Sequence, residues 1–577
     1  MATSGNPFWY HLLFGRWFSV FASILIMSVS GATYMFGLYS SHIKSSLAYD
    51  QTTLNLLSFF KDLGANIGVI SGLVNEVAPA WVVLLIGAVM NLFGYTMIWL
   101  AVTNRIPKPQ IWHMCLYICI GANSQTFANT AALITCVKNF PESRGSILGL
   151  FKGFVGLSGA ILSQLFHAFY GNNSKSLIFL IAWLPSAVSV ILHRFVRIIK
   201  DLRQPNELKV FYHVLYISLG LAGSLMVFII LQNRLRFQQI HYVGSAIVVI
   251  VLLLLPLAIV FREELRIWRS KIKNPIPQLE LASQLPPPPL TSAVPPAPPN
   301  PPSDSCFKNM FNPPNRGEDY TIPQAIFSID MIILFIATIC GVGGTLTAID
   351  NLGQIGESLR YPSHSTTTFI SLVSIWNYLG RVVSGFVSEY FWKKYKVPRP
   401  LFLFVTLILS CIGHLLIVFG VPNSLYFSSI IIGFCFGAQW PLIFAIISEI
   451  FGLKYYATLY NMGGAASPIG AYIMNVRVAG HLYDMEAERQ MEAAGRLRKE
   501  GEDLSCLGVE CYKKAFLIIT GSTVFGGLVS LILVVRTWKF YKDDIYRRFK
   551  EKEGEDIEMK MAAPTNNSLT AAKTVSA

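Results

Sequence analysis

Charged residues are scarce in this chain. They make up 14% of its 577 residues, whereas soluble domains carry about 25%. Hydrophobic residues account for 53% of the sequence, and the mean hydropathy is +0.49. A soluble fold of this composition would leave long apolar stretches in water. The composition therefore excludes an ordinary soluble protein and indicates a polytopic membrane protein.

The sequence also lacks the short motifs of catalysis and of phosphate or metal binding. It contains no HExxH, no GxxxxGK[ST] and no GxSxG, the patterns of zinc hydrolases, nucleotide-binding loops and serine hydrolases. These absences argue against an enzyme and against an ATP-driven pump, and we expect no cofactor and no metal site. The formal net charge of +14 does not indicate nucleic-acid binding, because Lys and Arg stand in short loops and tails between apolar runs.

Apolar runs long enough to cross a bilayer follow one another along the chain. A hydrocarbon core of about 30 Å needs roughly 20 apolar residues, and this length predicts about 14 spans, arranged as roughly 6 + 2 + 6. We place these spans at 17–40, 53–74, 80–103, 111–137, 145–170, 177–197, 208–231, 241–261, 325–350, 366–390, 400–420, 424–448, 455–478 and 514–537. The predicted fold class is an all-α polytopic membrane protein.

The spans divide the chain into consecutive parts. These are a cytoplasmic N-terminus (1–16), an N-terminal six-helix bundle (17–197), an inserted helix pair (198–261), a Pro-rich cytoplasmic linker (262–324), a C-terminal six-helix bundle (325–537) and a disordered cytoplasmic tail (538–577). Lys and Arg are more frequent on the side of both termini, which predicts that both termini are cytoplasmic. The first apolar run is too long for a signal-peptide core and is expected to stay as an anchor. The plasma membrane and the vacuolar membrane are equal alternatives.

Proline, cysteine and one sequon mark the loops. The linker carries PPPP (286–289) and then VPPAPPNPP, which favours extended polyproline II and predicts a spacer, with a ligand for a cytosolic partner as the alternative. Six of the nine cysteines lie in apolar spans and Cys306 faces the cytosol. Only Cys506 and Cys511 share an outer loop, where a disulfide and two free thiols are equal alternatives. Asn172 begins a sequon close to two spans, which leaves its glycosylation open.

The chain contains an internal repeat. SGLVNE (71–76) returns as SGFVSE (384–389) at an offset of about 313 residues, and the segment that begins at Arg144 aligns with the one that begins at Tyr456 at an offset of about 312. This nearly constant register indicates two bundles of like topology. Many transporters use such paired bundles to place a binding site between halves that move against each other.

Two stretches resemble a known family. RWFSVFASILIMSVSGATYMFGLYSSHIKSSLAYDQTTLN (16–55) and NFPESRGSILGLFKGFVGLSGAILSQLF (139–166) resemble the nodulin-like family of plant major facilitator proteins, the group that includes nuclear-fusion-defective proteins. The C-terminal half is similar to the oxalate/formate antiporter and monocarboxylate transporter branch, most visibly at NYLGRVVSGFVSE (377–389). The resemblance implies the major facilitator fold of two pseudo-symmetric six-helix bundles, here with two inserted helices, together with alternating access and secondary transport.

The resemblance also implies gate residues. The superfamily carries a loop signature, roughly G-x-x-x-D-R-x-G-R-R, after the second helix of each half, whose acid and cations close the cytoplasmic gate. The second-half copy matches its glycine, acid and basic tail at Gly385, Glu389, Lys393 and Lys394. The first-half copy keeps Gly72 and Glu76 but continues VAPAW without a basic residue. This departure leaves open whether the two gates close in the same way.

Arg381 is the main candidate for substrate binding. It lies about ten residues, or about 15 Å, from the cytoplasmic end of its span, near the bilayer midplane. A guanidinium at this depth costs several kcal/mol unless it faces a cavity or a partner. Its planar fork holds a carboxylate through two parallel hydrogen bonds, which predicts an organic anion as ligand. The similarity to monocarboxylate transporters, whose helix 8 arginine contacts substrate, implies the same role; a structural ion pair is the alternative.

Three further charged residues lie within predicted spans. Lys152 is either a second cation for a dicarboxylate, a partner of a gate acid, or a side chain that snorkels to the cytoplasmic surface. Lys61 and Asp62 are adjacent in sequence, so we expect them to point about 100° apart rather than at each other. A carboxylate at the depth of Asp62 carries a coupling proton or forms a structural ion pair.

Uncharged polar side chains mark the expected cavity walls. They lie at mid-span or near Arg381 and comprise Asn123, Gln125, Asn129, Trp376, Asn377, Gln439 and Trp440. Each is expected to donate a hydrogen bond to a substrate, with an interhelical hydrogen bond of about 0.6 kcal/mol as the alternative.

These features predict a secondary transporter, proton-coupled or an exchanger, that moves a small organic anion with Arg381 on the carboxylate. The same fold with an amino acid, a sugar or a metal chelate as substrate is the first alternative. The second is a non-transporting receptor or scaffold, in which the Pro-rich loop and the basic tail RTWKFYKDDIYRRFKEK (536–552) engage cytosolic partners or anionic lipids. The expected partners are a small solute, a coupling proton and the lipid bilayer.

Overall fold

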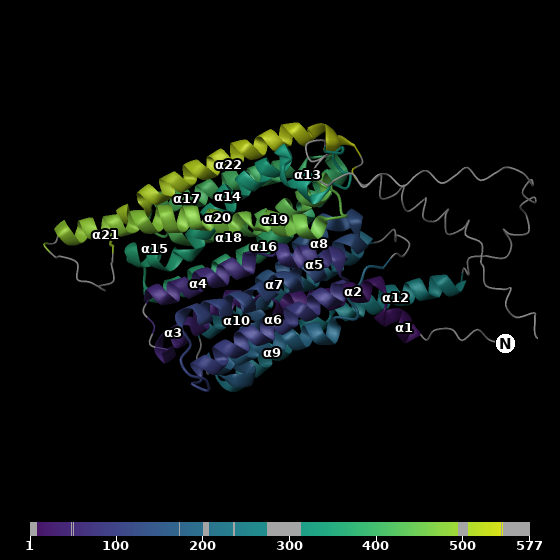
Figure 1. The fold of residues 1–577 in the computed structure, drawn as a ribbon, viewed down its shortest axis with the longest axis horizontal. Coiled ribbons are helices and arrows are strands. Elements are labelled where there is room, and N and C mark those ends of the chain that lie inside the picture. Colours follow the sequence, from purple (N-terminus) through teal and green to yellow (C-terminus); the bar gives the residue numbers. More distant parts are fainter. Residues whose placement is uncertain are drawn as a thin grey trace, which may run out of the picture.

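The computed structural model describes residues 8–47, 49, 51–171, 174–199, 207–234, 237–273, 313–493, 495, 506–543 and 545. Within these residues all regular secondary structure is helical (Figure 1). Most of the predicted linker and tail, together with Cys306 and the sequon at Asn172, lies outside the described residues.

The helices form two bundles that lie side by side, one from each half of the chain (Figure 1). The N-terminal bundle contains α2 (Arg16–Val29), a 3-10 turn (Ala32–Met35), α3 (Phe36–Leu47), α4 (Gln51–Asn66), α5 (Val69–Val77), α6 (Ala80–Val102), α7 (Ile111–Asn139), a second 3-10 turn (Pro141–Ser143), α8 (Arg144–Tyr170) and α9 (Ser174–Leu192). The C-terminal bundle contains α13 (Ile322–Ile326), α14 (Ile329–Asp350), α15 (Leu352–Ser358), α16 (Ser363–Tyr395), α17 (Arg399–Phe419), α18 (Ser424–Ile450), α19 (Tyr456–Gly464), α20 (Ala466–Ala471), a π-helix (Tyr472–Gly480), α21 (His481–Ala493) and α22 (Glu510–Lys542).

Among the described residues, ten helices are long and apolar enough to cross a membrane. The chain is therefore a multi-pass integral membrane protein, but this measure does not confirm the predicted count of about 14 spans. Two of the remaining predicted spans, 17–40 and 455–478, are broken into short helices. The other two correspond to α7 and α16, which are unbroken helices of 29 and 33 residues. Both contain polar residues that lower the mean hydropathy of the span.

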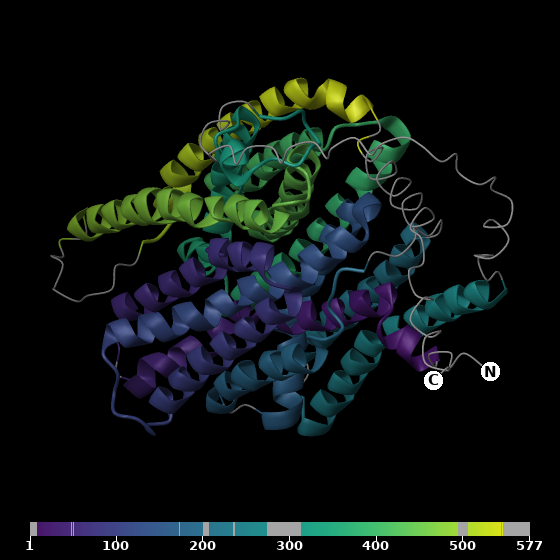
Figure 2. The same cartoon turned by 45° about the vertical axis from the view of Figure 1, so that its right-hand side comes forward.

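The inserted part consists of α10 (Glu207–Arg234), α11 (Gln239–Leu254) and α12 (Pro256–Lys273). These helices pack beside the N-terminal bundle, and the short helix α1 (Phe8–Leu13) packs on α12 (Figure 2). An ion pair between Arg16 and Glu207 joins α10 to the start of α2. The last helix runs on to Lys273, beyond the predicted end of the inserted pair at residue 261.

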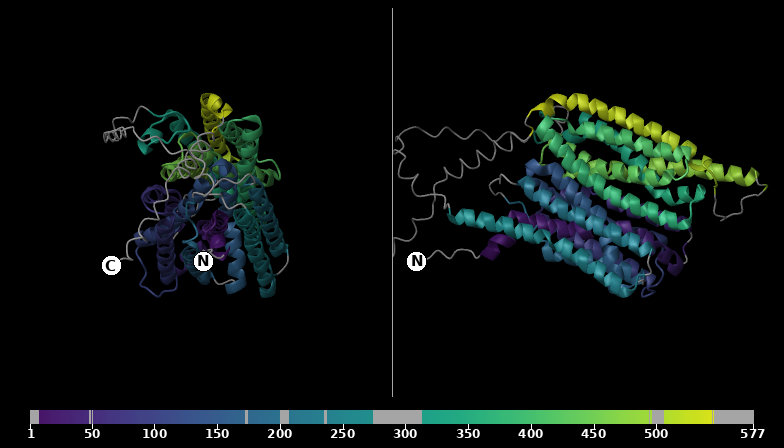
Figure 3. Two further views of the ribbon diagram at one scale, coloured as in Figure 1. Left: turned by 90° about the vertical axis from the view of Figure 1, so that its right-hand side faces the viewer. Right: turned by 180° about the vertical axis from the view of Figure 1, so that it is seen from behind.

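The two bundles touch through helix pairs that the internal repeat relates to each other. Helix α16 packs on α8, and α5 packs on α19. Further views show the N-terminal and C-terminal halves of the chain against each other (Figure 3). Glycines allow both contacts. A Cβ atom at Gly385 would lie 2.5 Å from the carbonyl oxygen of Gly145, and one at Gly72 would lie 2.7 Å from the Cα of Thr458. Any larger residue at either glycine would push the bundles apart.

Candidate functional site

A cavity of about 130 Å³ lies between the two bundles. Both halves contribute to its wall, and most of the side chains from the N-terminal half are polar or charged, whereas aromatic rings come from the C-terminal half. The lining residues are Thr33, Asp62, Ala65, Asn66, Gln125, Thr126, Asn129, Lys152, Val155, Leu346, Arg381, Phe436, Trp440, Phe444, Tyr460, Asn461, Gly464 and Ser467. The structure thus brings together six predicted site residues, namely Asp62, Gln125, Asn129, Lys152, Arg381 and Trp440.

Arg381 crosses from one bundle to the other. Its Nε donates a hydrogen bond of 2.9 Å to Oδ1 of Asn377, one turn earlier on α16. Its Nη1 donates a hydrogen bond of 2.8 Å to the backbone carbonyl of Lys152 on α8. The residue is only 2% exposed. Asn377, which does not line the cavity, thus orients the guanidinium, and the carbonyl of Lys152 holds it against the opposite half.

Lys152 brings a second cation to the same cavity. Its Nζ lies 4.9 Å from the ring centre of Phe444 and 5.0 Å from that of Tyr460, both in the C-terminal half. The two rings flank the ammonium group, and cation–π attraction of this kind is strongest where water is excluded. The alternative that the Lys152 side chain snorkels to the cytoplasmic surface is therefore wrong, because its ammonium group lies between two rings of the other half.

Amide groups line the wall near these cations. Oε1 of Gln125 accepts a hydrogen bond of 2.8 Å from Thr33, and Oδ1 of Asn129 accepts one of 3.2 Å from Ser30. Because both amide oxygens accept hydrogen bonds from the protein, the NH₂ groups of Gln125 and Asn129 can donate to an oxygen-bearing solute.

Besides Asn377, three predicted wall residues lie outside the cavity lining. Asn123 donates hydrogen bonds of 2.9 and 2.7 Å to the carbonyls of Gly64 and Ile67, at the interruption between α4 and α5. Gln439 is fully buried and donates to the carbonyl of Cys435 at 3.1 Å, while Trp376 packs near Phe434. Their depth along the helices was predicted, but sequence position alone does not fix which way a helix is rotated in a bundle.

A larger vestibule of about 1070 Å³ opens beyond this cavity and is lined by both halves. Asp62 lines both spaces and therefore stands where they meet. Its carboxylate forms an ion pair of 2.9 Å with Lys61. The expectation that these neighbours do not face each other is wrong, because the long lysine side chain bends back along the helix.

A second carboxylate, Asp350, lines the vestibule from the C-terminal half. It ends α14 and accepts a hydrogen bond of 3.3 Å from Asn475 of the π-helix. Asp350 did not stand out in the sequence, because acids are common at the ends of membrane spans. The one available signal was that Asp350 directly follows a long apolar run.

The opposite end of the interface is closed by a buried charge cluster. Glu389 accepts a hydrogen bond of 3.1 Å from the backbone N–H of Gly145, at the start of α8. The same carboxylate pairs with Arg399 and, at 3.2 Å, with Lys393. Arg399 also pairs with Glu449 at 2.6 Å. Lys394, predicted as part of this gate, instead donates to the Tyr390 hydroxyl on the exposed side of α16.

The other copy of the repeat forms an equivalent contact. Glu76 accepts hydrogen bonds of 3.0 and 3.4 Å from the backbone N–H groups of Ala457 and Thr458, at the start of α19. Lys138 of α7 lies 3.8 Å from its carboxylate and supplies the cation that the local sequence lacks. Glu76 and Glu389 thus each place a negative charge at the N-terminus of a helix from the opposite half, where the helix dipole favours it. We call these two contacts the latch.

The latch lies on the side of the chain's N-terminus, since Arg16 at the start of α2 donates to the carbonyl of Asn139, just before α8. The halves are therefore joined on that side and separated by the vestibule on the other. If both termini are cytoplasmic, as the sequence predicts, the vestibule opens toward the opposite side of the membrane.

Both halves of the chain match known protein families. Residues 16–261 match the family described as Nodulin-like, and residues 318–543 match the family described as NFD4, C-terminal domain. The N-terminal part of the chain is thus a nodulin-like domain, and the C-terminal part is an NFD4 C-terminal domain. This finding confirms the predicted family, whereas the similarity of the C-terminal half to oxalate/formate antiporters and monocarboxylate transporters stays a prediction.

One curated relative matches most of the chain, and another matches part of it. The chain is 25% identical over 557 residues to the protein NUCLEAR FUSION DEFECTIVE 4 of Arabidopsis thaliana, covering 92% of this chain and 90% of that protein. It is 26% identical over 216 residues to the probable transporter MCH1 of Yarrowia lipolytica, covering 36% of this chain and 42% of that protein. Among solved structures, the proton:xylose symporter XylE bound to 6-bromo-6-deoxy-D-glucose aligns with a TM-score of 0.51 at 11% identity, covering 91% of this chain and 96% of that structure. This likeness shows the major facilitator fold.

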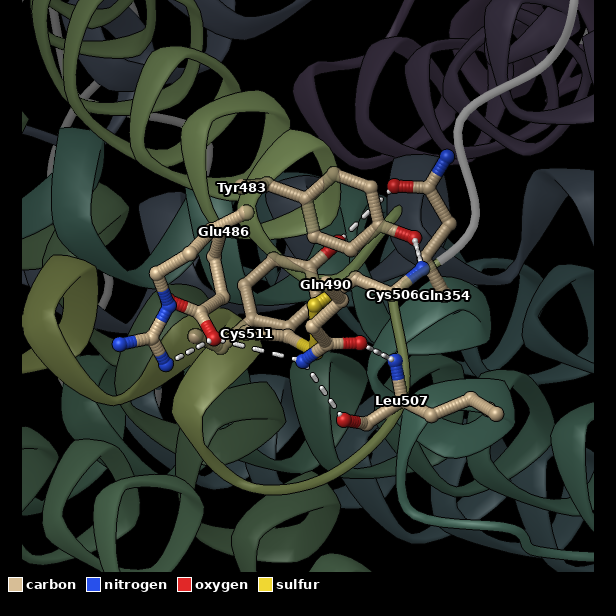
Figure 4. Close-up of a disulfide and its surroundings, with 9 residues drawn as sticks. Gln354, Tyr483, Glu486, Gln490, Cys506, Leu507 and Cys511 are labelled. Carbon is tan, nitrogen blue, oxygen red and sulfur yellow. Dashed lines mark hydrogen bonds and ion pairs between the residues drawn. A yellow bond between two sulfur atoms is a disulfide. The ribbon is translucent and has the colours of Figure 1, made fainter. Parts of the chain in front are cut away.

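A disulfide stabilises the rim of the vestibule. Cys506 and Cys511 are joined by a disulfide at the start of α22, and Gln490 of α21 is hydrogen-bonded to both backbone groups of Leu507 at 3.0 Å (Figure 4). Tyr512 donates a hydrogen bond of 2.9 Å to Gln354 of α15. These contacts therefore connect α21, α22 and α15 around the opening.

Proposed function

We propose that this chain is a secondary active transporter that moves a small organic anion, with a carboxylate as the bound group, by alternating access between its two bundles. The observation that carries the proposal is the pair of cations, Arg381 and Lys152, in a cavity lined by both halves. That cavity meets a vestibule on one side and the latch on the other. Intramembrane cations are retained at a cost of several kcal/mol, which favours a functional role for both.

The cavity has the chemistry of an anion site. Arg381 presents a planar fork that suits a carboxylate, and the NH₂ groups of Gln125 and Asn129 provide neutral donors nearby. A water molecule occupies about 30 Å³ in the liquid, so a cavity of about 130 Å³ suits a solute of few heavy atoms. Lys152 provides the second positive charge that a dicarboxylate requires.

The Arg381 contacts couple binding to movement. In the state described here, one N–H of the guanidinium is used by the carbonyl of Lys152 in the opposite half. A substrate carboxylate competes for this donor, because a charged acceptor forms a stronger hydrogen bond than a neutral carbonyl. Substrate binding would thus replace a direct contact between the halves with a contact through the substrate, which loosens the interface next to the latch.

Asp62 and Asp350 are the proposed sites for a coupling proton. They face the vestibule from opposite halves, and Asp62 also reaches the central cavity. Closing the vestibule would bring two carboxylates together in a drier space, which is costly unless one of them binds a proton. Lys61 provides the alternative, because it neutralises Asp62 without a proton.

Flux into proteoliposomes tests the carboxylate site. Arg381→Lys and Arg381→Gln are each expected to abolish uptake of the transported anion, because neither side chain reproduces the planar fork. Lys394→Gln is a matched control, since it removes an exposed cation from the same helix. Normal uptake by both Arg381 variants, with folding and insertion preserved, would contradict the proposal.

An amino acid is the second candidate substrate, because Asp62 lines the same cavity as Arg381. A zwitterion would place its carboxylate on Arg381 and its ammonium group on Asp62. Competition of uptake by carboxylates, amino acids, sugars and metal chelates separates these classes. If the protein is instead a receptor or scaffold, none of these solutes will cross the membrane.

A further inference from the structure

Helix α12 extends the α11 span well past the bilayer core. The helix Gln239–Ser270, which contains the apolar α11 span, has 32 residues, which at 1.5 Å per residue is about 48 Å. The hydrocarbon core is only about 30 Å thick. The last turns of α12 therefore reach the headgroup region and the water beyond it, on the side of the N-terminus, where α1 lies beside them (Figure 2).

The inner face of α12 is held firmly against the bundle. Glu264 is 1% exposed and accepts a hydrogen bond of 3.1 Å from the backbone N–H of Trp17, at the start of α2. The same carboxylate lies 3.3 Å from Nε2 of His11. Trp268 packs on the rings of Phe8 and His11. These contacts set the rotation of α12 about its axis.

The outer face carries a line of arginines. Arg262, Arg266 and Arg269 follow each other at spacings of four and three residues, which places them on one side of the helix. The side chains of Arg262 and Arg266 are 56% and 60% exposed, and Arg269 is exposed as well. Glu263 lies 3.3 Å from Arg262 and 2.8 Å from Arg266. One carboxylate does not balance three guanidinium groups, so the face stays positive.

Exposed aromatic rings lie next to these arginines. Trp9 and Tyr10 of α1 are 63% and 50% exposed, and Phe261 of α12 is 39% exposed. The rings of Phe8 and Phe261 are in contact at 5.5 Å, which joins the two helices. Tryptophan and tyrosine concentrate at the level of lipid headgroups, because one end of each ring system is apolar and the other is polar.

We propose that Arg262, Arg266 and Arg269, together with Trp9, Tyr10 and Phe261, form a binding surface for acidic phospholipids of the leaflet on the side of the N-terminus. We call it the α1–α12 surface. The guanidinium groups bind lipid phosphates through paired hydrogen bonds, and the aromatic rings pack between the neighbouring glycerol and acyl groups. The surface is far from the central cavity and does not depend on transport.

The test measures lipid preference of the full-length protein. The protein is placed in nanodiscs of phosphatidylcholine mixed with phosphatidylserine, and native mass spectrometry gives the binding of phosphatidylserine relative to phosphatidylcholine. Each interfacial arginine contributes about fivefold to binding of acidic lipid. The combined variant Arg262→Gln, Arg266→Gln, Arg269→Gln is therefore expected to lose on the order of a hundredfold in this preference at low salt.

Matched controls make the outcome specific. The combined variant Arg489→Gln, Lys513→Gln, Lys514→Gln removes three cations near the opposite end, two of them also paired with an acid three residues earlier. This control is expected to keep the preference for phosphatidylserine. The variant with lysine at the three α12 arginines is also expected to keep it, because the positive charge is retained. If the glutamine variant fails to fold, a salt titration of the unchanged protein replaces it, with a preference that falls as salt rises.

Two results would overturn the proposal. One is a preference that neither the α12 glutamines nor salt reduces. The other is binding of a soluble acidic polypeptide to the α1–α12 surface with no preference among lipids, which would identify a protein partner instead.

Discussion

Glu76→Gln is expected to shift the balance between the two orientations of the transporter. The substitution keeps the size of the side chain but removes the charge at the N-terminus of α19. The lost charge–dipole interaction is about 1 kcal/mol, the weaker hydrogen bonds to Ala457 and Thr458 cost about another 0.5 kcal/mol, and the lost pairing with Lys138 costs about 0.5 kcal/mol. The state with the latch closed thus loses about 2 kcal/mol, or about thirtyfold in population. The opposite state loses little, because there the side chain faces water.

Double electron–electron resonance measures this shift. Spin labels carried by non-natural amino acids at Phe59 and Tyr472 report on the vestibule, because these residues lie on its two walls. Opening of the latch closes the vestibule, so Glu76→Gln should increase the population with the shorter distance. Glu510→Gln is the control, since it removes a carboxylate that pairs with Lys513 away from the interface between the halves. An unchanged distance distribution in Glu76→Gln, or an equal change in Glu510→Gln, would refute the role of the latch.

Two further predictions concern packing and the interrupted helix. Gly385→Val should prevent closure of the latch and abolish flux while the protein still folds, because even a Cβ there would lie 2.7 Å from the Cα of Gly149. The control Gly521→Ala should transport normally, because a Cβ at Gly521 meets nothing within 4 Å. Equal flux by both variants would contradict this reasoning. Asn123→Ala should lower the free energy of unfolding by about 1–3 kcal/mol, because the carbonyls of Gly64 and Ile67 lose their hydrogen-bond donor. Thermal denaturation measures this loss. A change in substrate affinity with unchanged stability would instead indicate that Asn123 contacts the substrate.

The two cations of the central cavity were predictable, because placing a charge inside a membrane span costs several kcal/mol. Arg381 and Lys152 stood out on that ground alone, and both line the central cavity. The same reasoning failed for Asn123 and Gln439, which cost little when they bond within the bundle. A neutral polar residue carries no comparable signal, since an interhelical hydrogen bond satisfies it as well as a substrate does.

The latch was predictable in part. The repeat correctly related Glu76 to Glu389 and Gly72 to Gly385, and their contacts in the structure match pair by pair. Lys393, one turn after Glu389, pairs with it, but Lys138 and Arg399 were not predictable, because they come from other helices than the acids they pair with. Lys394 also follows Glu389 in sequence, but it lies on the exposed side of α16 and donates to Tyr390 instead.

Composition and residue order are enough to identify a membrane protein with repeated halves and with a few charges deep in apolar helices. They suffice because these properties depend on the cost of placing each residue in lipid. Which side chains meet across the halves, and which end of the interface is closed, could be read only from the folded chain. Those contacts depend on how each helix is rotated and paired, and packing among distant segments sets that rotation.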